Sequence, residues 1–267
     1  MTAARTPAEK GGPAAAKALA AAGLQPEELL IHAISGLLDG CRHIAVGVLS
    51  PIPGAAALLA GARTGARVSI IGCDLPAHRC DGGVELFDQA AQGRVDAFFL
   101  SGGQIDGRAN INLTGAGGDY PRQAVRWSGA FGSAFLYFQV PKVILFREEH
   151  SPRVFVEHVD FISAPGTSPK GTYRPGGPHA LVSPLCVMHF DRDRGGFRLA
   201  STHPGVTVEQ VRDQTGFDFE IPAQVPTTPL PDAATLARLR GEVAQVIADP
   251  YPAFAARVFG VAPRAAA

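Results

Sequence analysis

Residues 43–71 read HIAVGVLSPIPGAAALLAGARTGARVSII, and this stretch decides the fold class. Its first apolar run, residues 43–48, predicts a buried strand, and the alanine- and leucine-rich residues 54–62 predict a helix after two prolines. A second apolar run, residues 67–71, predicts another buried strand. Short buried strands that are joined through a helix are typical of a parallel sheet.

Part of the same stretch is long and uncharged enough to be mistaken for a membrane span. Residues 44–62 carry no charge, but Pro51 and Pro53 lie in the middle, where the missing N–H groups would break a membrane helix. The alanine-rich residues 1–23 are interrupted by charges and glycines, so they contain no continuous apolar core of a signal peptide. We therefore expect a soluble protein that binds no membrane.

The alternation of helices and strands continues on both sides of this stretch. Residues 26–38 form an amphipathic pattern that Gly40 is placed to end, residues 84–91 predict a further helix, and residues 96–100 predict a third strand. The fold class that this pattern predicts is α/β, with an open, mostly parallel sheet and helices on both faces.

The second half of the chain begins with a glycine-rich loop region, residues 101–133, and ends with a helix. Strands are expected at residues 143–146, 154–162, 180–190 and 197–201, the last two forming a hairpin around residues 191–196. Thr207 is expected to cap a short helix. Residues 222–232, rich in proline, predict an extended strap before a helix at 233–248. We expect a flexible segment at residues 1–24 and one domain at residues 25–267.

Composition excludes some classes of protein. The chain has 24 basic and 24 acidic residues, so it lacks the positive charge with which proteins bind nucleic acid. Its 4 cysteines are too scattered to form a disulfide framework, and they fit a reducing cytoplasm.

Ligands of open parallel sheets bind beyond the carboxyl ends of the strands. Three segments are expected there: residues 49–54, 72–81 and 101–118. The last contains Gly102 and Gly103, which allow the backbone to approach a ligand closely, and Gln104, whose amide can donate or accept a hydrogen bond.

Several residues of this loop region have simpler interpretations. Asp106, Asn110 and Asn112 are residue types that form turns by bonding to their own backbone. The sequence LSPIPG at residues 49–54 can be a plain strand-to-helix turn, or a helix N-terminus that favours an anion.

Five segments, in order, carry a resemblance to a known family. They are SGGQIDGRANIN (101–112), GDYPRQAVRWSGAFGSA (118–134), HVDFISAPG (158–166), GPHALVSPLCVMHFD (177–191) and STHPGVTVEQVRDQTGFDF (201–219). Together they resemble the β subunit of class I coenzyme A-transferases, glutaconate CoA-transferase in particular. The resemblance covers residues 43–219 and implies a sheet of the NagB/RpiA-like type.

The resemblance also implies an activity and a partner. It implies an acyl-CoA substrate, with coenzyme A as part of the substrate and no other bound cofactor, and an α-type subunit of related fold. It implies that Gly102, Gly103 and Gln104 hold the developing oxyanion. Gly54, at a helix N-terminus, and Arg126 are candidate contacts of coenzyme A, and a solvated or interface arginine is the alternative for Arg126.

The chain departs from the family at the catalytic position. The transferases carry a glutamate just after the second strand, and its carboxylate attacks the thioester. Here the glutamate should fall near Gly72, which has no side chain. Asp74 is the remaining candidate for a catalytic acid, although a displacement of ~1 Å can cost ~100-fold in rate. Cys73 is expected to be inert packing rather than a nucleophile.

This departure leaves alternatives open. The chain also resembles a hydrolase branch that opens rings of steroid-derived acyl-CoA compounds, whose catalytic acid comes from the α subunit. A non-catalytic subunit that only shapes the pocket is a further alternative. No metal site is expected, because residues 73–80 lack the paired spacing of zinc ligands. Glu148, Glu149 and His150 are expected to be a solvated strand end, and His203 to belong to a turn.

Overall fold

The computed structural model describes residues 11–261, and these divide into two compact units. Unit 1 contains residues 11–22 and 100–228, and unit 2 contains residues 23–99 and 229–261. The expectation of one domain over residues 25–267 stays a prediction.

The strands of unit 2 form the parallel arrangement that the sequence predicts. They are β1 (His43–Val46), β2 (Arg67–Ile71), β3 (Arg79–Cys80) and β4 (Ala97–Leu100). Their order is β4-β1-β2-β3, and every pair is parallel. All residues of β1 are buried, which is typical of a strand that is covered on both faces.

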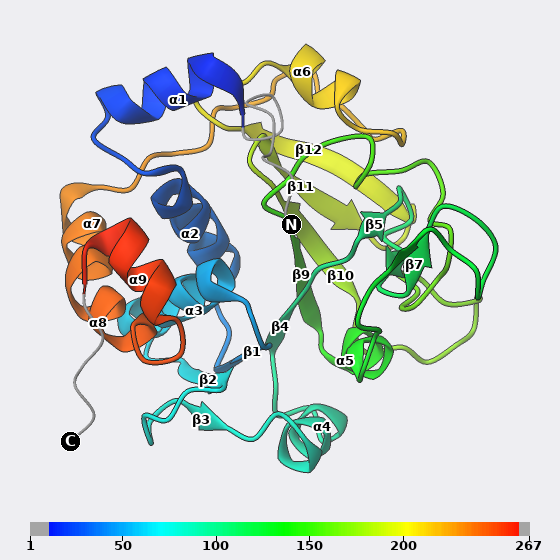
Figure 1. Cartoon of the computed structure of the whole chain (residues 1–267), viewed down its shortest axis with the longest axis horizontal. Helices are drawn as coiled ribbons and strands as arrows, with labels where there is room; N and C mark the ends of the chain where they lie inside the picture. Colours follow the sequence, from blue (N-terminus) through cyan, green and yellow to red (C-terminus); the bar gives the residue numbers. More distant parts are fainter. Residues whose placement is uncertain (1–10, 262–267) are drawn as a thin grey trace. The chain divides into compact units, whose positions relative to one another are not determined.

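Helices gather beside these strands (Figure 1). They are α2 (Pro26–Leu37), α3 (Pro51–Thr64), α4 (Val84–Ala91), α7 (Ala233–Arg238), a π-helical turn (Leu239–Val243), α8 (Ala244–Ile247) and α9 (Pro252–Phe259). Helix α3 begins at Pro51, earlier than predicted, because the first turn of a helix tolerates proline. It packs on β1 and β2. A Cβ atom on Gly61 would lie 2.8 Å from Val68 Cγ2, so glycine permits this close packing.

Unit 1 contains the antiparallel part of the fold. Its strands β9 (Lys142–Phe146), β10 (Pro178–Val182), β11 (Cys186–Asp191) and β12 (Gly196–Thr202) follow one another in this order. Strands β9 and β10 are parallel, whereas β10, β11 and β12 are antiparallel. The predicted hairpin around residues 191–196 is confirmed. The single strand predicted at residues 180–190 is wrong, because a turn at Ser183, whose N–H bonds to Cys186 O, separates β10 from β11.

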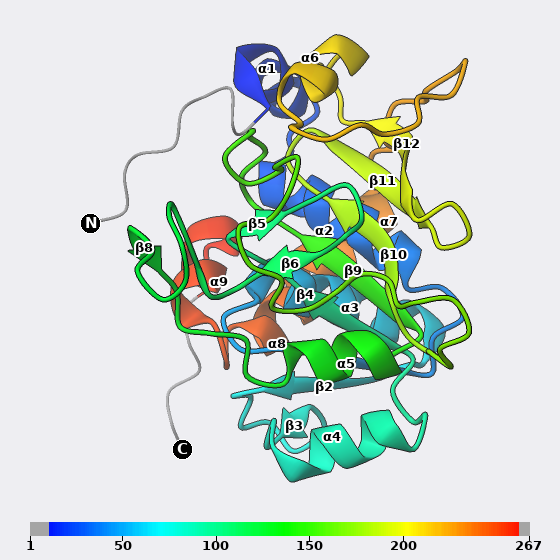
Figure 2. The same cartoon turned by 90° about the vertical axis from the view of Figure 1, so that its right-hand side faces the viewer.

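Three helices belong to unit 1: α1 (Gly12–Ala21), α5 (Ser133–Gln139) and α6 (Val208–Asp213). Thr207 caps α6 as predicted, its hydroxyl accepting from the Gln210 N–H. Helix α1 lies beside α6 (Figures 1 and 2), and the Gln210 side chain donates to Gly11 O. Within the predicted flexible segment, residues 12–21 are therefore helical, and residues 1–10 lie outside the described part of the chain.

Two short hairpins occupy the glycine-rich region. They are β5 (Gln104–Ile105) with β6 (Ile111–Asn112), and β7 (Gly115–Ala116) with β8 (Val125–Arg126). Figure 2 shows β5 and β6 side by side. The strand predicted at residues 154–162 is wrong. Ser151 O accepts from the N–H groups of both Val154 and Phe155, which closes a turn.

The predicted α/β class, with a mostly parallel sheet and helices, is confirmed by these elements. None of the helices in residues 11–261 combines the length and the apolar character that crossing a membrane requires.

Candidate functional site

The loop that follows β4 in unit 1 is folded by its own polar side chains. Asp106 is buried and accepts hydrogen bonds from the Arg108 and Asn110 N–H groups, both at 3.0 Å. Asn112, which is fully buried, accepts from the Thr114 N–H at 3.0 Å. The predicted turn-forming role is confirmed for Asp106 and Asn112. Asn110 instead reaches a distant segment, because its Oδ1 accepts from the Gly166 N–H at 3.1 Å.

Gln104 is buried on this hairpin with its amide held in one orientation. Its Oε1 accepts from Asn112 Nδ2 at 2.8 Å and from the Asp160 N–H at 3.0 Å. Both partners are donors, so the oxygen must face them and the NH₂ group must face away. Nε2 has no hydrogen-bond partner among residues 11–261. Gln104 is therefore a fixed donor that is free to bind another group.

Gly102 and Gly103 allow close packing at the same place. A Cβ atom on Gly102 would lie 2.5 Å from Ile111 Cγ2, and one on Gly103 would lie 2.1 Å from Trp127 Cζ2. The Gly103 N–H already donates to Asn112 O at 2.8 Å. The structure thus gives Gly103 a packing role and leaves the Gln104 amide as the available donor.

Arg126 lies on β8 of the second hairpin and is exposed. Its Nη1 donates to Gln123 Oε1 at 2.9 Å, and its guanidinium carbon lies 5.3 Å from the centre of the Tyr120 ring. The Tyr120 ring in turn contacts Phe161, with 5.3 Å between the ring centres. The guanidinium keeps its full positive charge in this contact, and the predicted contact of Arg126 with coenzyme A stays a prediction.

The carboxyl end of β2 in unit 2 is where the family's glutamate is expected, and it carries Gly72, Cys73 and Asp74. Gly72 has a φ of +84° and is exposed, and nothing lies within 4 Å of the place that a Cβ atom would occupy. Asp74 is exposed, and its N–H donates to Asp249 Oδ2 at 2.8 Å. The turn after β2 thus carries one acidic side chain of its own, Asp74, and contacts a second, Asp249.

Cys73 is buried in the same turn, with 2% of its surface exposed. Burial is the main reason that the pKa of its thiol rises to about 11, and the adjacent Asp249 carboxylate raises this pKa further. A thiol with such a pKa is protonated at neutral pH and is a poor nucleophile. These properties fit the packing role that we expect for Cys73.

The end of β1 leads into α3 through a turn. The Gly54 N–H donates to Ser50 O at 2.8 Å, as part of the helix, and a Cβ atom on Gly54 would lie 2.9 Å from Ile247 Cδ1. Close packing of α3 on the C-terminal helices accounts for this glycine. A contact between Gly54 and coenzyme A stays a prediction, without support from this geometry.

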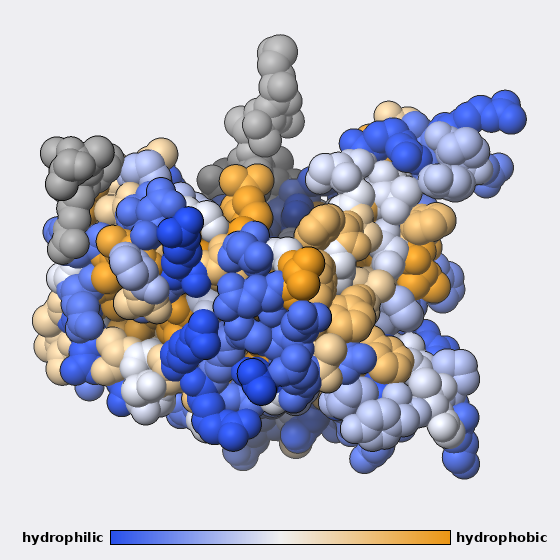
Figure 3. All heavy atoms as spheres, turned by 90° about the horizontal axis from the view of Figure 1, so that it is seen from below, coloured by the Kyte–Doolittle hydropathy of each residue, from blue (hydrophilic) through white to orange (hydrophobic). Residues whose placement is uncertain are grey.

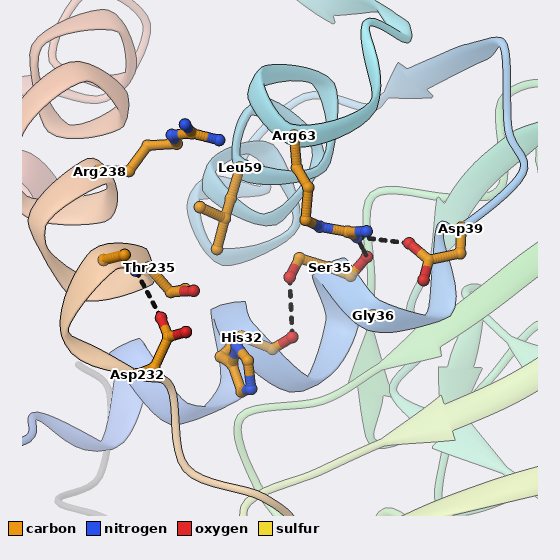
Figure 4. A pocket seen from close by; sticks show the side chains of 10 residues that line it. His32, Ser35, Gly36, Asp39, Leu59, Arg63, Asp232, Thr235 and Arg238 are labelled. Carbon is orange, nitrogen blue, oxygen red and sulfur yellow. Dashed lines mark hydrogen bonds and ion pairs between the residues drawn. The ribbon is translucent and has the colours of Figure 1, made fainter.

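A cavity of about 240 Å³ opens elsewhere in unit 2, between α2, α3 and α7 (Figure 4). Arg63 Nη2 donates to Ser35 O at 3.1 Å and to Asp39 Oδ1 at 2.5 Å, and Arg238 Nη1 donates to Ala62 O at 3.1 Å. Asp232 accepts from the Thr235 N–H and caps α7. The charged groups of this cavity are bonded to its own walls, so it is a weaker candidate than the strand ends.

Some residues lie where the sequence did not place them. Glu149 and His150 are 3% and 0% exposed, so the predicted solvated strand end is wrong for both. Ion pairs with Arg153 and Arg147 compensate the buried carboxylate of Glu149. The turn predicted at His203 is confirmed, since its carbonyl oxygen accepts from the Val206 N–H at 3.0 Å, but its ring is buried, with Nε2 bonded to Ser183 O at 2.8 Å.

Sequence reasoning missed Asp160, Asp249 and Tyr251 as neighbours of the candidate residues. Asp160 lies inside HVDFISAPG, one of the segments that carry the family resemblance, which was a possible signal. Asp249 and Tyr251 reach the strand ends from more than 170 residues away, and nothing local indicates this. No three His, Cys, Asp or Glu side chains gather as metal ligands in the described part of the chain.

The chain is similar to several known proteins. The family model for "Coenzyme A transferase" matches residues 41–214. The B subunit of 3-oxoadipate CoA-transferase from Pseudomonas knackmussii is 36% identical over 61% of this chain and 65% of its own length. The B subunit of glutaconate CoA-transferase from Acidaminococcus fermentans is 30% identical over 58% of each chain.

A third relative has a different activity in its name. The IpdB subunit of a cholesterol ring-cleaving hydrolase from Rhodococcus jostii is 34% identical over 50% of this chain and 53% of its own length. The chain thus spans less than two thirds of each of these three relatives.

Solved structures share the fold. The decarboxylase AibA/AibB is 25% identical with a TM-score of 0.69, over 89% of this chain and 100% of the other. IpdAB of Rhodococcus jostii RHA1 is 25% identical with a TM-score of 0.71, over 82% of this chain and 94% of the other.

Proposed function

Because the chain belongs to the coenzyme A transferase family, we propose that it is the β-type subunit of a heteromeric enzyme that acts on an acyl-CoA thioester. The observation that carries the proposal is the Gln104 amide, a buried donor with a fixed orientation in the glycine-rich loop after β4. Two of the relatives are B subunits of CoA-transferases, which supports the β-type assignment.

The proposed chemistry uses Gln104 as an electrostatic stabiliser. Attack on a thioester carbonyl places negative charge on its oxygen, and a donor that is already oriented stabilises that charge without reorganisation. Gly102 and Gly103 permit Ile111 and the Trp127 ring to approach the backbone beside Gln104. Coenzyme A would enter as part of the substrate, and the proposal requires no other cofactor.

The proposed partner is an α-type subunit. Unit 1 exposes large apolar side chains beside the Gln104 loop, and these suit burial against a second protein. They are Tyr120 (58% exposed), Val125 (49%), Phe131 (90%) and Ile162 (53%). On the face that Figure 3 shows, hydrophobic groups lie between hydrophilic ones at the surface.

A second candidate function is hydrolysis or carbon–carbon bond cleavage with the catalytic acid on the α subunit. The observation that favours it is Gly72, which leaves the place of the transferase glutamate without a side chain. Asp74 is exposed and follows Gly72 by two residues. Its backbone N–H is held by Asp249, which fixes it at that position rather than at the position of Gly72. The relative that is named as a ring-cleaving hydrolase supports this candidate.

Borohydride distinguishes transfer from hydrolysis. A transferase that forms a glutamyl-CoA thioester is reduced and inactivated when it is incubated with acyl-CoA and then borohydride. We expect this chain, in complex with its α-type partner, to acquire no such modification. Modification of this chain at Asp74, found by peptide mass, would show instead that it carries its own nucleophile.

A non-catalytic, pocket-forming role is tested with two substitutions in the purified complex. Gln104→Ala removes the fixed donor, and Asp74→Ala removes the exposed acid two residues after Gly72. Unchanged kcat in both variants would support a role in shaping the pocket only.

The expectation of a cytoplasmic location stays a prediction, and the free state of all four cysteines is consistent with it.

A further inference from the structure

A strained turn joins β1 to α3 in unit 2. Residues 47–50 form this turn, and its third residue, Leu49, has a φ of +55°, a conformation that side chains other than glycine rarely adopt. Leu49 is 87% exposed and its neighbour Val48 is 62% exposed. A leucine that is both strained and exposed contributes nothing to the core. Such outliers cluster at functional sites, where the surrounding structure holds them.

The hydroxyl of Tyr251 holds this turn from the other end of the sequence. It donates to Gly47 O at 3.2 Å and accepts from the Ser50 N–H at 3.3 Å. These two backbone groups would bond directly to each other in an ordinary four-residue turn. The Tyr251 hydroxyl therefore bridges the two backbone groups that close the turn, and it fixes the backbone on both sides of Leu49.

The same C-terminal segment holds the next strand end. Asp249 Oδ2 accepts from the Asp74 N–H at 2.8 Å, and its carboxylate lies beside the Cys73 thiol. The segment cannot shift easily, because the Tyr251 ring and Ile247 close over Gly54, where a Cβ atom would lie 3.4 Å and 2.9 Å from them. Two residues of one segment thus fix the carboxyl ends of both β1 and β2.

We propose that Tyr251 and Asp249 are positioning residues of the acyl-CoA site, and that Tyr251 holds Leu49 so that its side chain contacts the substrate. The inference rests on the proposed function, because the carboxyl ends of parallel strands are where such a substrate binds. Tyr251 acts through Leu49, and Asp249 acts through the backbone of residues 72–74.

A double-mutant cycle on KM tests the pair Tyr251 and Leu49 in the complex with the α-type partner. Tyr251→Phe keeps the ring and removes the hydroxyl. The turn at residues 47–50 is then no longer held in place, and we expect KM to rise about tenfold. Leu49→Gly relieves the strain, so Tm stays equal or rises while KM also rises. In the Leu49→Gly background, Tyr251→Phe has no further effect on KM, because coupled residues are not additive.

Tyr173→Phe is the matched control. Tyr173 is 85% exposed in unit 1, so the loss of its hydroxyl leaves KM unchanged. If Tyr251→Phe leaves KM unchanged, or if its effect adds to that of Leu49→Gly, the proposed role of Tyr251 is overturned. A fall in Tm that accompanies every rise in KM would likewise leave only a structural role.

Two measurements on the isolated chain need neither substrate nor partner. Hydrogen exchange of the Ser50 amide becomes faster in Tyr251→Phe, and that of the Asp74 amide becomes faster in Asp249→Ala. Alkylation of Cys73, followed by peptide mass, has a lower pH midpoint in Asp249→Asn, since the carboxylate raises the pKa of the thiol. Cys186, 0% exposed in unit 1, is the internal control, because its alkylation reports unfolding of the chain and should be the same in both proteins.

These readouts separate the two ideas. Absence of thioester turnover by the unmodified complex would overturn the proposed function, and the substrate contact of Leu49 with it. Unchanged exchange at Ser50 and Asp74, or an unchanged Cys73 midpoint, would overturn the positioning roles even if the complex is an active enzyme.

Discussion

The loops after β4 and the loops after β1 and β2 are built in opposite ways. The loop after β4 is held within unit 1, by its own side chains, with Asn112 bonded to Gln104 and Asn110 bonded to Asp106, and by residues 160–166 of the same unit. The turns after β1 and β2 are held by Tyr251 and by Asp249. A loop whose partners lie on the loop itself and about 50 residues along the chain depends less on the C-terminal segment than a turn that is held from 175 or more residues away.

This difference suggests separate duties for the two regions. A charge-stabilising donor such as Gln104 must stay oriented, and a buried local network provides that rigidity. A loop that admits substrates can instead be adjusted by the segment that holds it. A change of pH and single substitutions in each unit can test this contrast.

Acid is expected to have the largest effect, and it should reach unit 1 first. Burial lowers the pKa of His150 to about 3 and that of His203 to about 4, below the 6.5 of an exposed imidazole. Between each of these lowered pKa values and 6.5, the unfolded chain binds more protons than the folded chain. The free energy of unfolding therefore falls as pH falls below 6.5, by about 1.4 kcal/mol per pH unit for each histidine.

Trp127, the single tryptophan, lies in unit 1 and reports that unit alone. Urea titrations at pH 7 and pH 5, followed by its fluorescence and by circular dichroism of the whole chain, measure the two responses. We expect the fluorescence midpoint to fall more than the dichroism midpoint. Equal shifts would contradict the contrast between the units.

The orientation of the Gln104 amide is expected to have the next largest effect. Gln104→Glu keeps an oxygen for Asn112 and Asp160 but replaces the free NH₂ group with a carboxylate oxygen. Removing one such donor costs about 100- to 1,000-fold in kcat. Steady-state thioester turnover by the complex measures it, with Gln104→Ala for comparison. If Gln104→Glu retains the activity, the amide is a structural group.

The contrast also explains what the sequence could predict. The strands and helices of unit 2 could be predicted from apolar runs and prolines, because a parallel strand that is buried on both faces has an almost continuous run of apolar residues in the sequence. The turn at Asp106 follows from residue types that bond to their own backbone. Glycine at positions 102 and 103 indicated close approach, and the structure identifies Trp127 as the group that approaches Gly103.

Contacts between distant residues had no such local pattern. Tyr251 lies 201 residues from Ser50, and Asp249 lies 175 residues from Asp74, so only the folded chain joins them. Glu149 and His150 have polar side chains that predict exposure, and they are buried because Arg153 and Ser183 provide their partners. The local part of the site was thus predictable, and the part assembled from afar was not.

Gly103→Ala is expected to have an intermediate effect on unit 1. The added methyl group would lie 2.1 Å from Trp127 Cζ2, so the indole or the hairpin must move. Overpacking of this kind costs about 1–3 kcal/mol. Urea unfolding followed by tryptophan fluorescence measures the loss. Gly129→Ala, in open space but with a φ of +101°, separates backbone strain from the clash. A smaller loss for Gly103→Ala than for Gly129→Ala would contradict a tight contact.

The smallest effect concerns how unit 2 holds its C-terminal segment. Glu28 on α2 is 1% exposed and pairs with Arg240 Nε at 2.6 Å, whereas the adjacent Glu27 is 18% exposed and pairs with Arg257 Nη1 at 2.5 Å. Glu28→Gln keeps an acceptor for the Gln25 N–H but loses the charge, which should cost about 1 kcal/mol after allowance for the half-exposed arginine. Glu27→Gln should cost less than about 0.5 kcal/mol, because water screens that pair. Urea unfolding of the two variants by circular dichroism gives the comparison. The two glutamates are neighbours on one helix, so they differ mainly in burial. Equal losses would mean that burial does not set the strength of these ion pairs. The C-terminal residues would then not stabilise unit 2 in the way that we describe.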